Sequence, residues 1–509
     1  MKRLQLFFEQ NSLLYRINWN LLMKLVKKYS LFVLTTALLP NVYFAQNVCG
    51  GNIYALYLCG DSTVRAWGDG SLGDSSMASS NFAVKVHSVK NIVAIAAAGH
   101  SLALRNDGTV WSFGINWYGQ LGDCTTVMNI TYPVQVHGAG NIGFLTGVRS
   151  IACGAMHSIA LKNDSTVWAW GLNSRGQLGD SSSQNNRYVP VKVKNLSGII
   201  AIAGGGEFSL ALKKDGTVWT WGSNIFGELG NGTISATGCM CDSVPKQVPG
   251  LTGIVSIAAS NSAYHALVLK NDSTVWAWGN NNGGQLGDNT VNNIPSPIQV
   301  HGPGNVGFLT GIKKIAVGSV HSMALKNDET IFTWGANSSG QLGDGTTNDR
   351  HVPQQLPGIN NVTQIACGSE FSLFQKNDGT VWSFGYNYDG QLGDGAYNTT
   401  GCYCSSLPVQ VWGPCNIAAG ISESQVEETH ILVYPNPMQT TGRIQITGNG
   451  SGQPFLLKLY NYAGLKVREI VCRKSFLDIE KGELTPGMYI YCITDPNGRL
   501  LVEGKLMIQ

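Results

Sequence analysis

Charge is scarce in this sequence. Only 13% of its residues are Asp, Glu, Lys or Arg, and the formal net charge is +3. So small a net charge gives no reason to expect a nucleic acid or another polyanion as partner. Long apolar runs are also missing, because no segment after the N-terminal region contains about eighteen consecutive apolar residues. We therefore expect no transmembrane segment in the mature chain.

The usual signatures of catalysis are absent as well. The sequence has no G-x-S-x-G elbow, no H-E-x-x-H helix and no phosphate-binding loop that opens a helix. The acidic residue of each G-Q-L-G-D motif stands alone, whereas calcium binding and glycoside hydrolysis need clustered carboxylates. We expect a protein that is not an enzyme and that uses no cofactor and no metal ion.

What the sequence has in abundance is glycine, with 63 residues, and one motif that recurs along the chain. The third copy reads VWAWGLNSRGQLGD at Val167–Asp180, and the fifth reads VWAWGNNNGGQLGD at Val275–Asp288. A period of roughly fifty residues is typical of solenoids, propellers and other arrays. The glycine after the last aromatic residue marks each copy, namely Gly68, Gly114, Gly171, Gly222, Gly279, Gly335 and Gly385.

Each period predicts four short antiparallel strands, which together form one propeller blade. In the third repeat they are VRSIACG, HSIALKND, STVWAWG and YVPVKV, and the middle pair is joined by Asn-Asp-Ser-Thr, a tight-hairpin sequence. Trp168 and Trp170 lie two residues apart and so share one face of their strand. We expect both rings to lie between neighbouring blades, opposite small side chains.

A family resemblance follows from these elements. The run GAMHSIALKNDSTVWAWGLNSRGQLGD resembles the regulator-of-chromosome-condensation repeat, whose members form seven-bladed propellers. The resemblance covers about residues 46–411, although the first repeat has Arg65 in place of tryptophan and lacks the N-x-x-G-Q stretch, as a terminal blade can. The fold class implied is all-β, with a seven-bladed propeller of four-stranded blades over residues 46–415. We expect the ring to close where Pro408–Val411 meets the N-terminal strand near Val48.

A second, longer period indicates that a block of repeats was duplicated. The segment VQVHGAGNIGFLTGV at Val134–Val148 recurs as IQVHGPGNVGFLTGI at Ile298–Ile312, and Gly-Cys-Met-Cys at Gly238–Cys241 recurs as Gly-Cys-Tyr-Cys at Gly401–Cys404. We infer that repeats two to four gave rise to repeats five to seven. A binding feature built on the block should then occur twice.

The two ends of the sequence predict export. Residues 1–45 have a basic flank, an apolar run and a plausible cleavage point after Ala45, which is typical of a secretory signal peptide. This signal peptide is unusually long, which is explained if translation starts at Met23 and not at Met1. After a linker at 416–430, the motifs YPNP, Y-N-x-x-G and G-M-Y over 431–509 resemble the sorting domain of type IX secretion substrates of Bacteroidota. Its alternating strands predict a small β-sandwich.

Several residues are candidates for binding or chemistry. His100, His157, His265 and His321 share one repeat position, but each lies in a different repeat, so we expect a structural role and no metal. All 12 cysteines lie after Ala45, where disulfides can persist. We expect local disulfides in the two C-x-C loops, with Cys415 a possible partner in the second. Cys49, Cys153 and Cys367 share the first-strand position and are predicted to be buried thiols or a bridge where the first and last repeats meet.

The two variable positions of N-x-x-G-Q are the candidate binding site. They lie on a fixed frame and carry aromatic residues or arginine, which are typical of protein recognition; the alternative is that neighbouring loops bury them. The candidate residues are Trp117, Tyr118, Arg175, Phe226 and Tyr388.

The predicted function is that of an exported, non-enzymatic propeller that binds a protein or glycan, or acts as an adhesion scaffold, at the cell surface. The resemblance at the C-terminus implies contact with the secretion machinery. The alternative is an inhibitor of a secreted enzyme. Guanine-nucleotide exchange, a role of the propeller family, is disfavoured because export separates the protein from any cytosolic GTPase.

Overall fold

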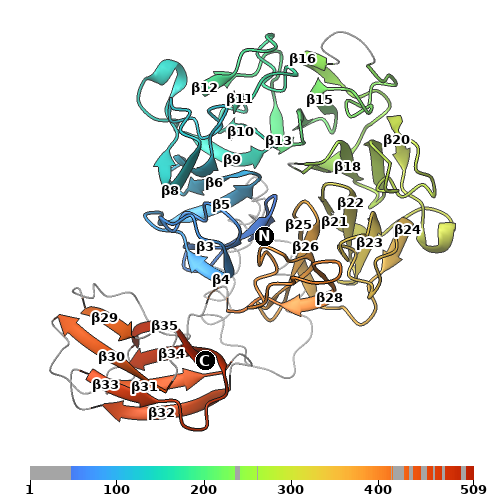
Figure 1. Cartoon of the computed structure of the whole chain (residues 1–509). Coiled ribbons are helices and arrows are strands. Elements are labelled where there is room, and N and C mark those ends of the chain that lie inside the picture. The colour runs from blue at the N-terminus through green and yellow to red at the C-terminus, as the bar shows by residue number, and fades with distance from the viewer. Residues whose placement is uncertain are drawn as a thin grey trace, which may run out of the picture. The chain divides into compact units, whose positions relative to one another are not determined.

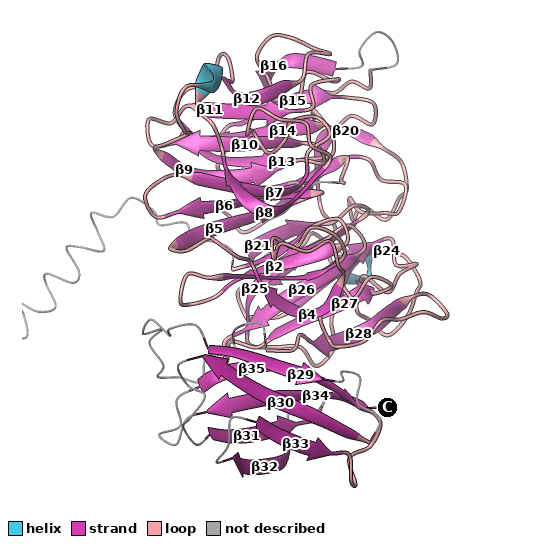
Figure 2. Ribbon diagram, turned by 60° about the vertical axis from the view of Figure 1, so that its left-hand side comes forward, coloured by secondary structure: helices cyan, strands magenta, loops and turns pink. Residues whose placement is uncertain are grey.

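The computed structural model describes residues 47–235, 241–260, 262–413, 415, 429–434, 440–448, 455–461, 465–472, 476–494 and 500–508. The predicted signal peptide and nearly all of the predicted linker lie outside this part. Strands make up almost all of its regular structure, and the only described helical segments are the 3-10 turns η1 (Ala139–Asn141) and η2 (Pro303–Asn305) (Figure 2).

Seven four-stranded antiparallel sheets, in chain order, confirm the predicted blades (Figure 1). Blades one to three are β1 (Val48–Gly50), β2 (Tyr54–Leu58), β3 (Val64–Gly68), β4 (Ser80–Lys85); β5 (Ile92–Ala97), β6 (His100–Arg105), β7 (Val110–Ile115), β8 (Asn129–Gln135); β9 (Val148–Cys153), β10 (His157–Lys162), β11 (Val167–Gly171) and β12 (Arg187–Lys192).

The remaining blades repeat this order. Blades four and five are β13 (Ile199–Gly204), β14 (Phe208–Lys213), β15 (Val218–Ser223), β16 (Cys241–Gln247); β17 (Ile254–Ala258), β18 (His265–Lys270), β19 (Val275–Gly279) and β20 (Ile294–Gln299). Blades six and seven are β21 (Ile312–Val317), β22 (His321–Lys326), β23 (Ile331–Gly335), β24 (Arg350–Gln355); β25 (Val362–Cys367), β26 (Phe371–Lys376), β27 (Val381–Tyr386) and β28 (Cys404–Gln410).

The backbone conformation explains why a glycine follows the last aromatic residue of the motif. The register between β11 and β12 shifts between Ala169 and Gly171, and Gly171 has a φ of +103°. A side chain there would place its Cβ 2.6 Å from the carbonyl oxygen of Met156, so glycine is needed both for the dihedral angle and for the close approach. The same shift precedes the marker glycine in all seven blades.

The hydrophobic core of the propeller is divided among the interfaces between blades. Trp170 of blade three, for example, is fully buried among Leu102, Val110 and Val136 of blade two. Each of the seven clusters joins two neighbouring sheets. Each blade is therefore stabilised by its neighbours and has no separate core of its own.

The ring closes by side-chain packing and a disulfide. Val48 of blade one and Val411, directly after β28, belong to one buried cluster, while β1 pairs with β2 and β28 pairs with β27. The two segments thus meet without pairing as strands, and among the described residues single backbone hydrogen bonds join the two blades, such as that from the amide of Ser369 to the carbonyl oxygen of Gly51 at 3.2 Å. A disulfide between Cys59 and Cys415 links the two blades covalently.

One longer turn reaches across the ring. The turn of blade five separates Ala258 from His265, and within it the hydroxyl of Ser262 donates to Oδ1 of Asn52 in blade one at 3.2 Å. The same hydroxyl lies 3.0 Å from Oγ of Ser369 in blade seven. Blade five is therefore linked to blades one and seven, of which neither is its neighbour.

The C-terminal segment forms two further antiparallel sheets, β29-β30-β33 and β32-β31-β34-β35. Ile479 of the first sheet shares a buried cluster with Leu457, Ile493 and Leu506 of the second. Residues 462–464 of the Y-N-x-x-G motif lie outside the described residues, and on either side of them the backbone amide of Leu465 donates to Oδ1 of Asn461 at 3.0 Å. The strands are β29 (Thr429–Tyr434), β30 (Thr441–Gly448), β31 (Phe455–Tyr460), β32 (Lys466–Cys472), β33 (Phe476–Glu480), β34 (Gly487–Thr494) and β35 (Leu500–Ile508).

The two tryptophans of β11 differ in burial, which corrects the expectation that both rings lie between blades. Trp170 is inaccessible and its Nε1 donates to the carbonyl oxygen of Gln120 at 2.9 Å. Trp168 is only half-buried; its Nε1 donates to Thr166 Oγ1, and the ammonium group of Lys162 lies 5.6 Å from the ring centroid. Trp168 lies nearer the hairpin, where the neighbouring blade covers it less.

We predict that Trp170→Ala lowers the free energy of unfolding by about 3–5 kcal/mol, because it leaves a cavity and removes one of the two donors to the buried carbonyl group of Gln120. Trp168→Ala should cost about 1–2 kcal/mol, the scale of partial burial and a cation–π contact. Denaturant unfolding of the two variants provides the comparison. Equal losses would contradict this assignment of the two rings.

Candidate functional site

Each blade presents a turn face and a hairpin face. On the turn face, the backbone amide of Leu172, directly after β11, donates to the carbonyl oxygen of Met156 in the turn before β10. On the hairpin face, the amide of Val148, at the start of blade three, donates to Gly108 in the Asn-Asp-Gly hairpin of blade two. The variable N-x-x-G-Q positions therefore belong to the turn face.

Two buried amides hold the loop that carries these positions. Oδ1 of Asn173 accepts the backbone amide of Leu178 at 3.1 Å, and Oε1 of Gln177 accepts that of Arg175 at 2.8 Å. The side chains of Asn173 and Gln177 are fully buried. Because the Asn and Gln amides bond the loop backbone, the two residues between Asn173 and Gly176 can vary without changing its course. The same bonds recur in blades two, five, six and seven.

Blade four replaces the glutamine with Glu228, which keeps the geometry. Its Oε2 accepts the backbone amide of Phe226 at 2.6 Å, and its Oε1 accepts the hydroxyl of Ser223 at 2.9 Å. Burial raises the pKa of the Glu228 carboxyl above its ordinary value. The residue is a structural substitute for glutamine on an otherwise unchanged loop.

The first variable position points to solvent. Trp117 in blade two is 48% exposed and Tyr388 in blade seven is 50% exposed. Neither ring contributes to a core cluster. These two candidate residues are therefore accessible to a partner.

The second variable position turns toward the next blade. Nε of Arg175 lies 3.5 Å from a carboxylate oxygen of Glu207 in blade four, and the ring of Phe226 meets that of Tyr264 in blade five edge to face at 5.3 Å. Tyr118 is half-buried. The five candidates thus do not converge on one pocket; they lie around the turn face, and two of them, Arg175 and Phe226, also contact the neighbouring blade.

The four histidines are buried between blades, each against a serine of the next blade. His157 Nε2 lies 2.9 Å from Ser209 Oγ, and that hydroxyl donates to the carbonyl oxygen of Gln177. Because the serine proton is used in this way, the imidazole must donate through Nε2. The same contact joins His100 to Ser158, His265 to Ser322 and His321 to Ser372.

The histidine position obeys a pairing rule around the ring. Blades four and seven have Phe208 and Phe371 there, and the residues that share their clusters in the next blade are Ala266 and Ala55 in place of serine. In blade one, the Tyr54 hydroxyl lies 2.6 Å from Ser101 Oγ. Polar residues therefore face polar ones and apolar residues face apolar ones, which avoids unpaired buried groups.

Metal binding has no support in the described residues, since no group of three or more His, Cys, Asp or Glu there could hold an ion. Burial lowers the pKa of His157 to about 3, so its imidazole is neutral. The same holds for the histidines at 100, 265 and 321.

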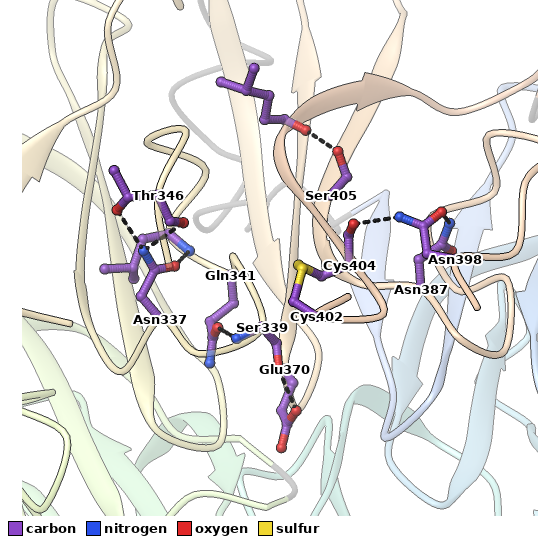
Figure 3. The surroundings of a disulfide bond; sticks show 12 residues. Asn337, Ser339, Gln341, Thr346, Glu370, Asn387, Asn398, Cys402, Cys404 and Ser405 are labelled. Carbon is purple, nitrogen blue, oxygen red and sulfur yellow. Dashed lines mark hydrogen bonds between the residues drawn. A yellow bond between two sulfur atoms is a disulfide. The ribbon is translucent and has the colours of Figure 1, made fainter. Parts of the chain in front are cut away.

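The disulfides agree in part with the sequence analysis. Cys402 and Cys404 form the predicted local bridge in blade seven (Figure 3). Cys241 is also disulfide-bonded, and its expected partner Cys239 lies outside the described residues. Cys415 bonds Cys59 instead of joining the second loop. Cys49, Cys153 and Cys367 are free thiols, which excludes the alternative of a bridge among them.

The hairpin face carries the duplicated segment as two equivalent loops. Ile142 is 81% exposed on η1 and its counterpart Val306 is 77% exposed on η2. In both loops a histidine forms a hydrogen bond with the asparagine four residues later. Nδ1 of His137 lies 2.6 Å from Oδ1 of Asn141, and Nδ1 of His301 lies 2.7 Å from Oδ1 of Asn305. The block duplication inferred from the sequence thus extends to backbone conformation.

Comparison with known families identifies two parts of the chain. The RCC1-like domain matches residues 30–300, and the regulator of chromosome condensation (RCC1) repeat matches residues 312–341, 328–375 and 362–391. The secretion system C-terminal sorting domain matches residues 432–509. Among the described residues, no helix is long and apolar enough to cross a membrane.

Several known proteins are similar to large parts of this chain. The human E3 ubiquitin-protein ligase HERC2 is 33% identical over 293 residues, which is 54% of this chain but 6% of that ligase. The ultraviolet-B receptor UVR8 of Arabidopsis thaliana is 27% identical over 61% of this chain and 69% of its own length. The solved structure of Prp20p from Saccharomyces cerevisiae superposes with a TM-score of 0.58, at 23% identity, over 70% of this chain and 87% of that one.

The histidine–serine pairs predict a pH dependence of stability. Each histidine has a folded-state pKa of about 3, below its ordinary value of 6.5, so acid protonates the unfolded chain first. Stability should therefore fall as the pH drops from about 6.5 to about 3, by about 2 kcal/mol per histidine at about pH 5. His157→Phe combined with Ser209→Ala, which copies the natural Phe208–Ala266 pair, should remove one such contribution.

The measurement is denaturant unfolding of the wild type and the double variant at about pH 7.5 and about pH 5. Tyr54→Phe with Ser101→Ala is the matched control, because that pair has no group that titrates in this range. An unchanged pH dependence in the histidine variant would show that the pKa of His157 is the same in the folded and unfolded chain, and would contradict the prediction.

Proposed function

This chain belongs to the RCC1-like family, and we propose that it is an exported, non-enzymatic propeller that binds a protein or glycan at the cell surface. The sorting domain at residues 432–509 marks it for export to the surface or the medium and for contact with the secretion machinery. The single observation that carries the binding proposal is the pair of exposed rings, Trp117 and Tyr388, on loops that buried amides hold in place.

Relatives support a protein as the first candidate ligand. The structure of Prp20p was described together with its binding to Gsp1p and histones. HERC2 is named as a ubiquitin ligase, but this chain matches only a small part of it. Rigid loops that present aromatic rings lower the entropy lost on binding, which suits a recognition surface. Nucleotide exchange is disfavoured, since an exported chain does not meet cytosolic GTPases.

The sorting domain generates a first test of this function. A chain tagged near Asn47 should appear outside the cell, shortened at its C-terminus. Deletion of residues 431–509 should leave it in the periplasm, and fractionation with immunoblotting measures both outcomes. Surface display that does not depend on those residues would overturn the assignment.

A second test concerns the turn face. Pull-down from outer-membrane and culture fractions with the exported chain should recover a partner, and Trp117→Ala with Tyr118→Ala should weaken its binding by roughly 2 kcal/mol or more, the range of interface hot spots. The first block should dominate over its copy, because Asn282 and Gly283 replace these rings there.

Ile142→Ala with Phe144→Ala on the hairpin face is the control for this test, because these residues are also exposed. Calorimetric titration of the recovered partner measures the affinities, and thermal unfolding checks the fold of each variant. Loss of binding in the hairpin-face variant alone would move the binding site to that face.

A further inference from the structure

Blade seven carries a cluster of tyrosines that the sequence analysis did not single out beyond Tyr388. Tyr386, Tyr388, Tyr397 and Tyr403 all lie between the end of β27 and the start of β28. The rings of Tyr388 and Tyr403 meet edge to face with centroids 5.6 Å apart, and both residues are exposed, as is Tyr397. These rings form an aromatic surface and do not belong to a core.

The loop beneath the rings is tied at several points. The disulfide between Cys402 and Cys404 brackets Tyr403, and the side-chain amide of Asn398 donates to the carbonyl oxygen of Cys404 (Figure 3). The backbone amide of Asn387 donates to the carbonyl oxygen of Tyr403 at 2.7 Å. The surface is therefore organised before any ligand binds, which reduces the entropy lost on binding.

Carboxylates without a counter-charge adjoin the rings. Glu370 lies in the turn before β26, and Asp389 follows Tyr388 directly. Neither forms an ion pair with a lysine or arginine in the described part of the chain, and the sequence has no Lys or Arg between residues 377 and 413. The backbone amide of Tyr386 donates to the carbonyl oxygen of Glu370 at 2.9 Å, which places this turn beside the end of β27. Burial together with the charges of Asp389 and Glu370 raises the pKa of Tyr386.

Comparison with the first copy of the block shows that the second copy lacks a cation beside its glutamate. In the first copy, Glu207 occupies the position of Glu370, and Arg175 of the preceding blade forms an ion pair with it. The charge of Arg175 also acts on Tyr264, where it partly offsets the rise in pKa that burial causes. In the second copy the position of Arg175 is taken by Ser339, whose hydroxyl donates to Glu370 Oε2 at 2.8 Å (Figure 3). In the first copy, blade three thus places the cation Arg175 beside the glutamate of the next blade. In the second copy, blade six places the neutral Ser339 there.

We propose that the surface formed by Tyr388, Tyr403, Glu370 and Asp389 binds a lysine or arginine side chain of a partner protein. The partner's cation takes the place that Arg175 occupies in the first copy. The rings offer their faces to the cation and the carboxylates offer charge-assisted hydrogen bonds. This assignment rests on the proposed function and names the chemistry of the partner at one position of the ring.

The test uses the full chain and a short, capped, fluorescent peptide that alternates lysine with glycine and serine. Fluorescence anisotropy should show binding of this peptide and of its arginine version, weakened by added salt, and no comparable binding of the glutamine version. Ser339→Arg should weaken binding roughly tenfold, because the new arginine pairs with Glu370 and fills the site. Ser338→Arg, at the exposed neighbouring position, adds the same charge and should have a much smaller effect.

Two further variants separate the rings from the charges. Tyr388→Ser should weaken peptide binding several-fold while Tyr388→Phe retains it, and Asp389→Asn should act like Tyr388→Ser. Ile225→Ser, at the matching position of blade four, should leave binding unchanged. Equal binding of the lysine and glutamine peptides, or equal effects of Ser339→Arg and Ser338→Arg, would overturn the proposal, as would tyrosine-dependent binding of a neutral oligosaccharide that Asp389→Asn does not weaken.

The proposal and the proposed function can fail separately. A surface partner that binds the Ser339→Arg chain as tightly as the wild type would refute this site and leave the binding function intact. Binding of the lysine peptide in the absence of any recoverable partner would support the site and count against the wider function.

Discussion

The propeller depends on one repeated joint between blades, the backbone carbonyl group of the glutamine in G-Q-L-G. In blade two this carbonyl, on Gln120, accepts both Nε1 of Trp170 and the hydroxyl of Ser158 from blade three. All three groups are buried, so the loss of either donor weakens the joint, and the loss of Ser158 also leaves Nε2 of His100 without its partner. The repeated motif is long because it has two tasks in each blade. Its loop positions this carbonyl group, and its strands carry the two donors that bond the carbonyl group of the preceding blade.

Several features of the fold could be predicted from the sequence because they are local. Alternation along Val167–Gly171, the Asn-Asp-Gly hairpins and the marker glycines each depend on neighbouring residues, and seven copies make the pattern unmistakable. Trp168 was misjudged because alternation fixes the face of a strand but not how far the next blade extends over it. Sequence alone also could not pair Cys59 with Cys415, whose distance in the chain says nothing about where the ring closes.

The candidate site was predictable only as a set of positions. The frame around Asn173 and Gln177 made the variable residues visible, but their directions depend on the next blade, which turns Arg175 toward Glu207 and leaves Trp117 in solvent. The pairing of Phe208 with Ala266 was present in the sequence as a change in two successive repeats. It could have been found by comparing each repeat with the following one and not only with the consensus.

The bond between Cys59 and Cys415 has a mechanical consequence. The bond joins Cys59, directly after β2, to Cys415, which follows β28, so residues 59–415 form a closed covalent loop and residues 416–509 are attached to it at Cys415. A pull on that tail is transmitted to both blades at once and cannot peel blade seven away strand by strand. Until the tail is removed, a force on it is therefore shared between blades one and seven through the sulfur–sulfur bond and is not borne by the hydrophobic interface alone.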